Sequence, residues 1–348
     1  MKKVVLVVLV MLLALAMFAG SSADPAQPDN SETQSTQGTQ EEGASKGKIG
    51  VAMPEIKNVV FNVMSKSVVE TAEKAGYETI VLDANNDPQT QTTQIEDLIS
   101  QGVDGILFTP VDSAALSDAV KMVNEENIPI VAMDRSVEAG DLVALIESDN
   151  VKFAYEAGVA MVEAAKEMGI EASDLKVLEI QGDLTSSAGR ERSEGIQQAA
   201  EELGFTIVSS LPANWDPDKA YNAALDGLQA NPDINAIFMA ADSLYLQPVE
   251  SVLEQREALL PVGEQGHIIT AGVDGSPYAM ESIRNKTADI SASQQVMQMG
   301  EQGVAKLIEA IEGKAEFNAN EHIKIAPVIV TAENVDDPAL WANNVEEE

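Results

Sequence analysis

The 348-residue chain is long enough for about two domains, and its 45% hydrophobic content is sufficient for buried cores. Its 57 Asp and Glu residues outnumber 21 Lys and Arg residues, and the resulting charge of −36 excludes non-specific binding to nucleic acid and disfavours anionic membranes. The absence of cysteine excludes disulfides, thiol nucleophiles and Cys-ligated metals, and the chain has only two histidines. We therefore expect neither a cofactor nor a metal ion.

Residues 1–23 predict a secretory signal peptide. Two lysines precede an apolar run at 4–19, and small residues follow up to position 23. This run is shorter than the roughly 20 residues that a transmembrane helix needs, so a membrane anchor is the weaker alternative. The sequence around Ser21 resembles a lipoprotein signal in which serine stands in place of the lipidated cysteine. An exported protein is expected, either periplasmic or at the cell surface.

Two terminal segments are predicted to lie outside the folded body. Residues 24–46 are rich in Ser, Thr, Gln, Glu, Pro and Gly and almost lack apolar side chains, which is typical of a flexible polar linker. Residues 333–348 are predicted as an acidic tail.

From residue 47 onward, short apolar runs alternate with longer segments of helical periodicity, which predicts parallel sheets covered by helices on both faces. The predicted strands are Ile49–Met53, Thr79–Leu82, Gly105–Phe108, Ile128–Met133, Leu142–Ile146, Lys176–Ile180, Thr206–Ser209, Ala236–Met239, Ile268–Gly272 and Ile323–Val330. The predicted helices include Phe61–Ala75, Gln91–Gln101, Ala114–Glu125, Lys152–Met168, Ala188–Leu203, Pro217–Gln229 and Gln298–Glu312. So many strands favour two doubly wound sheets, and hence two lobes.

The two halves of the body resemble each other. Residues 104–136 read DGILFTPVDSAAL…IPIVAMDRS, and residues 234–276 read INAIFMAADSLYL…HIITAGVDGS. In each, a strand ends near an Asp-Ser pair, a helix follows, and the next strand ends at another aspartate, Asp134 or Asp274. The pattern predicts a duplicated α/β unit with ligand contacts at the carboxyl ends of the strands.

The motifs give no support to catalysis. The chain has no GxSxG, GxxxxGK[ST], GxGxxG or HExxH motif. Residues 83–87 begin like an EF-hand loop, but Pro88 and Gln94 occupy positions that need glycine and glutamate, so a polar turn is the better interpretation. A protein that is not an enzyme is expected, and turnover of a bound small molecule would revive the enzyme alternative.

Asp134 and Arg135 directly follow a predicted strand and are candidates for binding adjacent sugar hydroxyls. The carboxylate accepts hydrogen bonds and the guanidinium donates them in a planar fork. A surface turn with a local salt bridge is the alternative. Phe61 and Trp215 could stack on a sugar face, and the alternative for both is packing in the core.

A run of charged residues begins the helix that follows the loop at 182–189. We expect Arg190 to point into the cleft, and Glu191 and Arg192 to be structural or exposed.

These ordered motifs resemble the periplasmic ribose-binding type of sugar-binding proteins, the solute receptors of ABC importers. The resemblance covers residues 48–331, and its motifs are Gly50–Phe61, Val81–Pro88, Pro110–Ser113, Ile128–Arg135, Ser148–Asn150, Ser187–Gly195, Ala213–Asp216, Gly272–Pro277 and Gln294. It implies the type I periplasmic binding protein fold, in which two lobes joined by three crossings close over a ligand. The implied lobes are 47–148 plus 295–320 and 149–294 plus 321–332, with crossings near 148–150, 274–294 and after 315.

The resemblance also implies a set of ligand-binding residues. These are Asn58, Phe61, Asp134, Arg135, Ser148, Arg190, Trp215, Asp274 and Gln294. Thr109 and Ala241 stand where ribose binders have asparagines, and Val60 and Val273 replace phenylalanines; Thr109, Ala241 and Val273 could still contact the ligand. A buried hydroxyl left unpaired costs roughly 1–3 kcal/mol, so we expect ribose to bind poorly and a different or larger polyol to fit better.

The expected function is therefore capture of a small neutral sugar or polyol by hinge closure, by a monomer that delivers it to an ABC permease. The alternative is a receptor that presents a small signal molecule to a membrane chemoreceptor or sensor. A cytoplasmic sugar-responsive repressor would need a basic DNA-binding headpiece, which residues 1–46 do not provide.

Overall fold

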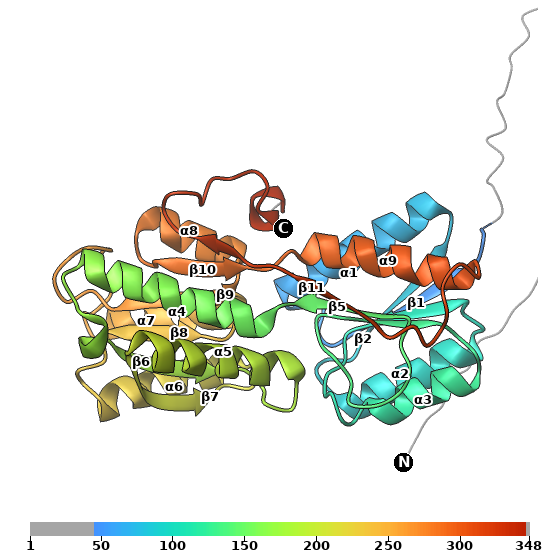
Figure 1. The fold of residues 1–348 in the computed structure, drawn as a ribbon, viewed down its shortest axis with the longest axis horizontal. Helices are drawn as coiled ribbons and strands as arrows, with labels where there is room; N and C mark the ends of the chain where they lie inside the picture. Colours follow the sequence, from blue (N-terminus) through green and yellow to red (C-terminus); the bar gives the residue numbers. More distant parts are fainter. Residues whose placement is uncertain (1–44, 346–348) are drawn as a thin grey trace, which may run out of the picture. The chain divides into compact units, whose positions relative to one another are not determined.

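The computed structural model describes residues 45–345, so the predicted signal peptide and nearly all of the predicted linker lie outside the described residues. The described chain forms two α/β lobes, each built on a six-stranded sheet with helices on both faces (Figure 1). This confirms the predicted fold class.

The sheet of the first lobe is entirely parallel and has the strand order β11-β5-β4-β3-β1-β2. Helices α1 and α9 pack together on one face of this sheet, and α2 and α3 pack on the other. The strands are β1 (Lys48–Met53), β2 (Glu78–Asp83), β3 (Gly105–Phe108), β4 (Ile130–Met133), β5 (Ala144–Ser148) and β11 (Glu321–Ile325), and the helices are α1 (Val59–Ala75), α2 (Pro88–Ser100), α3 (Ser117–Glu125) and α9 (Val296–Ile311).

The sheet of the second lobe has the order β12-β10-β9-β8-β6-β7, with only β12 antiparallel to its neighbour. Helices α4 and α5 cover one face, and α6, α7 and α8 cover the other. The strands are β6 (Lys176–Gln181), β7 (Thr206–Pro212), β8 (Ala236–Met239), β9 (Ile269–Asp274), β10 (Ile290–Ser293) and β12 (Val328–Val330); the helices are α4 (Asn150–Glu167), α5 (Ser187–Leu203), α6 (Pro217–Ala230), α7 (Asp242–Gln255) and α8 (Pro277–Asn285), with short 3₁₀ turns at Ala172–Asp174 and Trp341–Asn344.

The two sheets repeat the same winding. The predicted repeat units are β3-α3-β4 and β8-α7-β9, and both pairs of strands occupy the same places in their sheets. Each sheet therefore ends its β4 or β9 strand at an aspartate, Asp134 or Asp274, at the carboxyl edge where open α/β sheets bind ligands.

The last strands differ from the prediction. The run expected as one strand, Ile323–Val330, is two strands in different sheets, because Ala326 and Pro327 interrupt it and proline lacks the N–H that a continuous ladder needs. The placement of residues 321–325 in the second lobe is wrong, since β11 pairs with β5 of the first. Strand β10 was not predicted, because its sequence ISAS is short and rich in serine.

Three chain crossings join the lobes. The first is at Asp149, between β5 and α4, and the second is at Gln294 and Gln295, between β10 and α9. The third is at Ala326 and Pro327, later than the expected position after residue 315.

The C-terminal segment is folded rather than an acidic tail. Val335, Leu340 and Trp341 are 4%, 2% and 2% exposed and belong to the same buried cluster as α1 and α7 side chains. The prediction of a tail failed because the segment is acidic overall, whereas these three apolar side chains pack in the core. Only residues 346–348 of the predicted tail lie outside the described residues.

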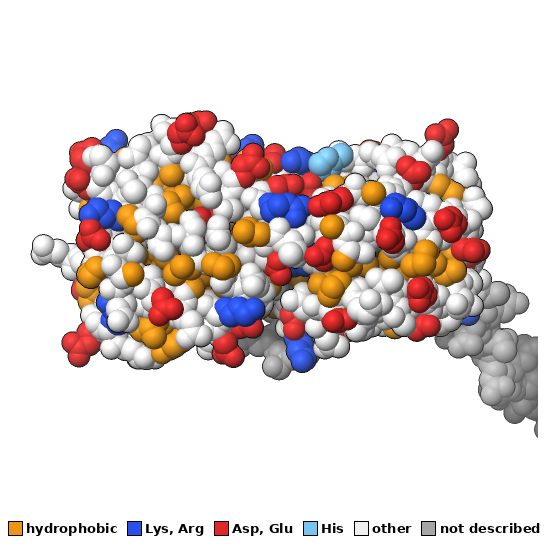
Figure 2. Space-filling view, turned by 90° about the horizontal axis from the view of Figure 1, so that it is seen from below, with side chains coloured by type: hydrophobic (Ala, Val, Ile, Leu, Met, Phe, Trp, Pro, Cys, Tyr) orange, Lys and Arg blue, Asp and Glu red, His pale blue; other side chains and the backbone are white. Residues whose placement is uncertain are grey.

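Acidic side chains are spread over the surface. On the face shown in Figure 2, Asp and Glu side chains lie between apolar and uncharged ones, with few Lys and Arg among them. Within residues 45–345, no helix has the length and apolar character needed to cross a bilayer.

Two glycines with similar φ angles, Gly275 and Gly169, test how closely β10 packs against the backbone next to Asp274. Gly275 has φ 75°, and a Cβ there would lie 2.2 Å from Ser293 Oγ and 2.7 Å from its Cα; Gly169 has φ 76° and open space around it. We expect Gly275→Ala to lower the free energy of unfolding by about 3 kcal/mol or more, and Gly169→Ala by about 1 kcal/mol, measured by urea denaturation. Equal losses would show that β10 does not pack this closely.

Candidate functional site

A small cavity lies between the carboxyl edges of the two sheets. The space between its walls that protein atoms do not fill is about 260 Å³, open solvent included. Its walls come from the start of α1, the turn after β4, the start of α5, the turns before α6 and α7, and the ends of β9 and β10; they comprise Asn58, Val60, Phe61, Asp134, Arg135, Ala188, Arg192, Trp215, Ala241, Asp274 and Gln294. Residues from both lobes therefore face one space.

Most residues predicted from the sequence meet in this cavity. Ser148 does not line it, but its hydroxyl donates to Oε1 of the lining residue Gln294 at 2.8 Å. Thr109 and Val273 are fully buried but do not line the cavity, whereas Ala241 does. The predicted residues that line it are Asn58, Phe61, Asp134, Arg135, Trp215, Asp274 and Gln294.

The expectation for Arg190 is wrong, whereas Arg192, expected to be structural or exposed, is structural and also lines the cavity. Arg190 is exposed and donates to the backbone oxygens of Leu184 and Thr185, outside the cavity. Arg192 is 3% exposed and lines the cavity. Helical spacing could have shown this, because Arg192 lies four residues after the buried Ala188 and four before the buried Ile196, on the inner stripe of α5.

Asp274 is the centre of a buried network. Its Oδ1 accepts from Gln294 Nε2 at 2.7 Å and Arg192 Nη1 at 3.3 Å, and its Oδ2 accepts from Ser243 Oγ at 2.5 Å. Arg192 also donates to Asn150 Oδ1 and to the backbone oxygen of Ala240. Burial raises the pKa of Asp274 to about 7 despite the opposing effect of Arg192.

Asp242 holds the backbone behind this network. Its carboxylate accepts from the N–H groups of Gly275 and Ser276, both at 3.1 Å, and from Ser291 Oγ at 2.5 Å. The turn that carries Asp274 is therefore fixed from the interior of the second lobe.

The opposite wall places a cation between two aromatic rings. The Arg135 guanidinium carbon is 5.1 Å from the centre of the Phe61 ring and 5.3 Å from that of Trp215, within the range of cation–π attraction. Arg135 is 4% exposed, its Nε is 3.6 Å from Asp134 Oδ2, and burial lowers its pKa. The alternative of a surface turn with a local salt bridge does not apply, because both Asp134 and Arg135 are buried.

The Trp215 ring is held by its own turn and by a neighbouring glycine. Asn214 and Trp215 both have positive φ, 52° and 58°, a strained conformation for a tryptophan. Tyr245 accepts from the Trp215 N–H at 2.8 Å and stacks near its ring. A Cβ at Gly182 would lie 2.2 Å from the indole, so glycine there lets the ring approach.

Three polar atoms of the lining have no hydrogen-bond partner among the described residues. They are Asp134 Oδ1, Arg135 Nε and Trp215 Nε1. A buried polar atom without a partner costs roughly 1–3 kcal/mol, so this wall is suited to a ligand that offers both hydrogen-bond acceptors and a donor.

Direct hydrogen bonds join the lobes at the rim of the cavity. The Ser113 N–H of the first lobe donates to Thr185 O of the second at 3.2 Å, and Ser113 Oγ accepts from the Ser187 N–H at 3.0 Å. Ser187 Oγ in turn accepts from the Ser136 N–H at 2.9 Å. The structure therefore shows the lobes in contact.

A second buried carboxylate lies beside the first crossing. Glu147, at the end of β5, is 1% exposed, and its Oε1 is 2.7 Å from His322 Nε2 of β11. Burial, with a contribution from the neighbouring Glu191, raises the pKa of Glu147 to about 8.

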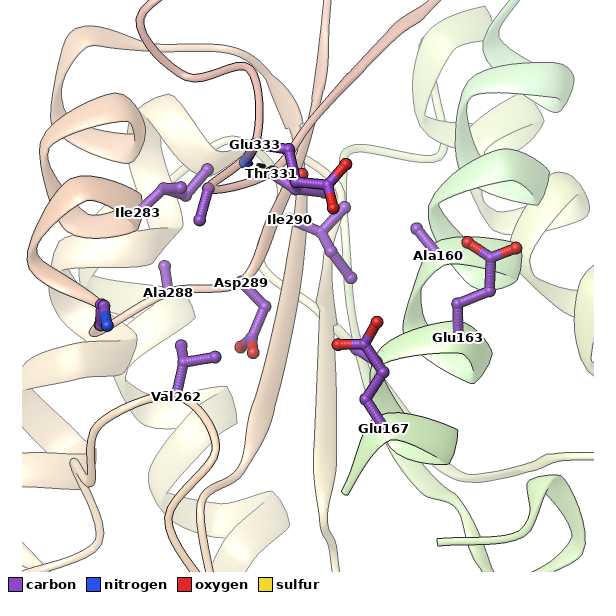
Figure 3. A pocket seen from close by; sticks show the side chains of 13 residues that line it. Ala160, Glu163, Glu167, Val262, Ile283, Ala288, Asp289, Ile290, Thr331 and Glu333 are labelled. Carbon is purple, nitrogen blue, oxygen red and sulfur yellow. Dashed lines mark hydrogen bonds between the residues drawn. The ribbon is translucent and has the colours of Figure 1, made fainter. Parts of the chain in front are cut away.

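A wider cavity elsewhere lacks these features. About 970 Å³ of space, open solvent included, lies between α4 and the β10–α8 side of the second lobe (Figure 3). Figure 3 shows Glu163 and Glu167 on α4 and Asp289 across from them. Asp289 is already bound to His267 Nε2 at 2.9 Å and the Thr270 N–H at 2.8 Å, and the described residues contain no metal-binding cluster of His, Asp and Glu.

Comparisons with known proteins agree with this geometry. The sequence model of the periplasmic binding protein domain matches residues 49–315. The chain is 33% identical over 266 residues to the ribose import binding protein of Bacillus subtilis, which covers 76% of this chain and 82% of the relative. The Escherichia coli ribose import binding protein is 31% identical over 270 residues, or 78% of this chain and 86% of the relative. The chain belongs to the periplasmic binding protein family.

Solved structures of this binding-protein family share the fold. An ABC transporter solute-binding protein from Bacillus halodurans C-125, with bound myo-inositol, superposes with a TM-score of 0.75 at 26% identity, covering 87% of this chain and 100% of the other. These relatives are sugar-binding transport proteins and not enzymes, as the sequence predicted.

The two arginines of α5 provide a matched pair for testing the site. Arg192→Gln leaves the buried Asp274 without its cation, so we expect the free energy of unfolding to fall by about 3 kcal/mol. Arg190→Gln, two residues away and exposed, should cost less than about 1 kcal/mol. Urea denaturation measures both, and losses of equal size would contradict the assigned orientation of α5.

The raised pKa of Glu147 predicts that the stability of the protein depends on pH. Its pKa is raised in the folded state, so the folded protein holds the proton more tightly and stability falls as pH rises from about 4.5 to about 8. Glu147→Gln removes this titration and should gain at least about 1 kcal/mol relative to wild type between pH 5 and pH 8.5.

Denaturation curves at the two pH values measure this gain. The exposed Glu73→Gln is the control and should follow wild type. A Glu147→Gln variant with the wild-type pH profile would contradict the burial of an uncompensated acid.

Proposed function

We propose that this protein is an exported solute-binding protein that captures one small neutral sugar or polyol by closure of its two lobes and delivers it to an ABC importer. The observation that carries the proposal is the cavity between the lobes, where unpartnered buried polar atoms lie beside two aromatic rings. Hydroxyl groups can both donate and accept, and sugar C–H faces pack on aromatic rings.

The charges of the cavity favour a neutral ligand. Arg135 and Arg192 are balanced in formal charge by Asp134 and Asp274. A polyol that hydrogen-bonds these groups leaves no net charge buried, whereas an anion or a cation would. The strongly acidic surface also disfavours anionic ligands on approach.

Closure of the two lobes is inferred from the cavity walls, because each lobe contributes part of them. Phe61, Asp134 and Arg135 belong to the first lobe, and Arg192, Trp215 and Asp274 to the second, so one ligand contacts both only when the lobes meet. Ligand binding then favours the closed arrangement by its differential affinity for that state. The hydrogen bonds of Ser113 and Ser187 at the rim of the cavity would form when the lobes reach this closed arrangement.

Delivery to a permease is inferred from the relatives. The chain shares its family with ribose import binding proteins, and the similar solved structure is named as an ABC transporter solute-binding protein with myo-inositol bound. Export is inferred from the predicted signal at residues 1–23 together with this family membership.

A thermal-shift panel of D-ribose, D-allose, xylitol and myo-inositol, followed by calorimetry, tests the ligand class. At 100 times Kd, a ligand adds about 2.7 kcal/mol, which should raise the melting temperature by about 5 °C or more. D-ribose should bind more weakly than the best polyol, because Ala241 offers only a methyl group to the cavity. Failure of all four and of a wider sugar panel would contradict the proposal.

Variants test the cavity itself once a panel member binds. Asp134→Ala and Arg192→Ala should each weaken binding of that sugar at least tenfold, or about 1.4 kcal/mol, as measured by calorimetry. Arg190→Ala is the control and should bind as wild type does. Unchanged affinity in both cavity variants would place the ligand elsewhere.

A further inference from the structure

Trp341 connects the C-terminal segment to the candidate site. It lies beyond residues 49–315, the range that the family model matches. Its side chain is 2% exposed, and its indole Nε1 donates to the backbone oxygen of Asp274 at 3.1 Å. Asp274 is the residue whose carboxylate is the centre of the cavity network.

The segment that carries Trp341 is firmly attached to α8. Arg284 of α8 donates to Asp336 Oδ1 at 2.7 Å, to Val335 O at 3.1 Å and to Asn343 Oδ1 at 2.6 Å. Val335 is buried in the same cluster as Trp341. The indole is therefore held in a defined place rather than resting on the surface.

The backbone that Trp341 contacts has an unusual conformation. Asp274 has φ 133°, which L-residues rarely adopt, and Gly275 follows with φ 75°. Such residues stay in place only when their surroundings determine them from several sides. Here the Asp274 oxygen accepts from the Gln294 N–H at 3.0 Å as well as from Trp341.

We propose that Trp341 is a positioning residue for the binding site, which holds the strained Asp274 backbone so that its carboxylate faces the cavity. The indole N–H of Trp341 is then part of the binding machinery, although Trp341 contributes no side chain to the cavity wall. The expected effect of Trp341 on sugar affinity rests on the proposed function. Its expected effect on the Asp274 backbone does not.

Hydrogen exchange of the full chain without added sugar tests the backbone. Trp341→Phe keeps an aromatic ring and removes the N–H donor, so the amide of Gln294 should exchange at least about fivefold faster, the equivalent of one lost hydrogen bond. Leu340→Ala is the matched control, because Leu340 is buried in the same segment but has no bond to Asp274. It should speed exchange within 335–345 and leave Gln294 as in wild type.

Calorimetry with myo-inositol and with D-allose tests the consequence for binding. Trp341→Phe should weaken whichever of the two binds wild type about fivefold or more, and Leu340→Ala should lower the melting temperature without changing that affinity. Wild-type exchange at Gln294 in Trp341→Phe, or equal acceleration in both variants, would overturn the proposal. If neither sugar binds wild type, only the choice of ligand fails, and the exchange result still decides the role of Trp341.

Discussion

The rest of the site depends on one buried carboxylate, Asp274. A carboxyl group this deep needs polar partners, and these are Arg192, Gln294 and Ser243. Gln294 lies in the second crossing between the lobes. It accepts a hydrogen bond from Ser148, the residue just before the first crossing at Asp149. The network that satisfies Asp274 is therefore the same network that joins the hinge to the cavity.

Under the proposed function, this coupling would give lobe closure a chemical basis. Asp274 and Arg192 of the second lobe are bonded to neighbours in their own lobe, whereas Asp134 and Arg135 of the first lobe have atoms that lack a partner among the described residues. A polyhydroxylated ligand would supply the missing partners only where the two sets meet, so its binding energy would favour the closed arrangement.

Much of this could be predicted from the sequence, because alternating strands and helices and an internal repeat specify the winding and place Asp134 and Asp274 at strand ends. The rest depended on tertiary contacts. The sequence favours Arg190 over Arg192 as the cavity residue of α5, because the partners of Arg192, Asn150 and Asp274, come from distant parts of the chain. Pro327 separates two strands that belong to different sheets, and Trp341 is buried within an acidic segment.

Distance between the lobes is the most direct measurement of the central claim. The chain has no cysteine, so Lys121→Cys in α3 and Glu201→Cys in α5 would give one pair of dye sites for single-molecule energy transfer, one on each lobe. With a panel sugar that binds, the account predicts that the high-transfer population grows with sugar concentration and that Arg192→Gln abolishes the response. Saturating binding with no change in the distance distribution would contradict it.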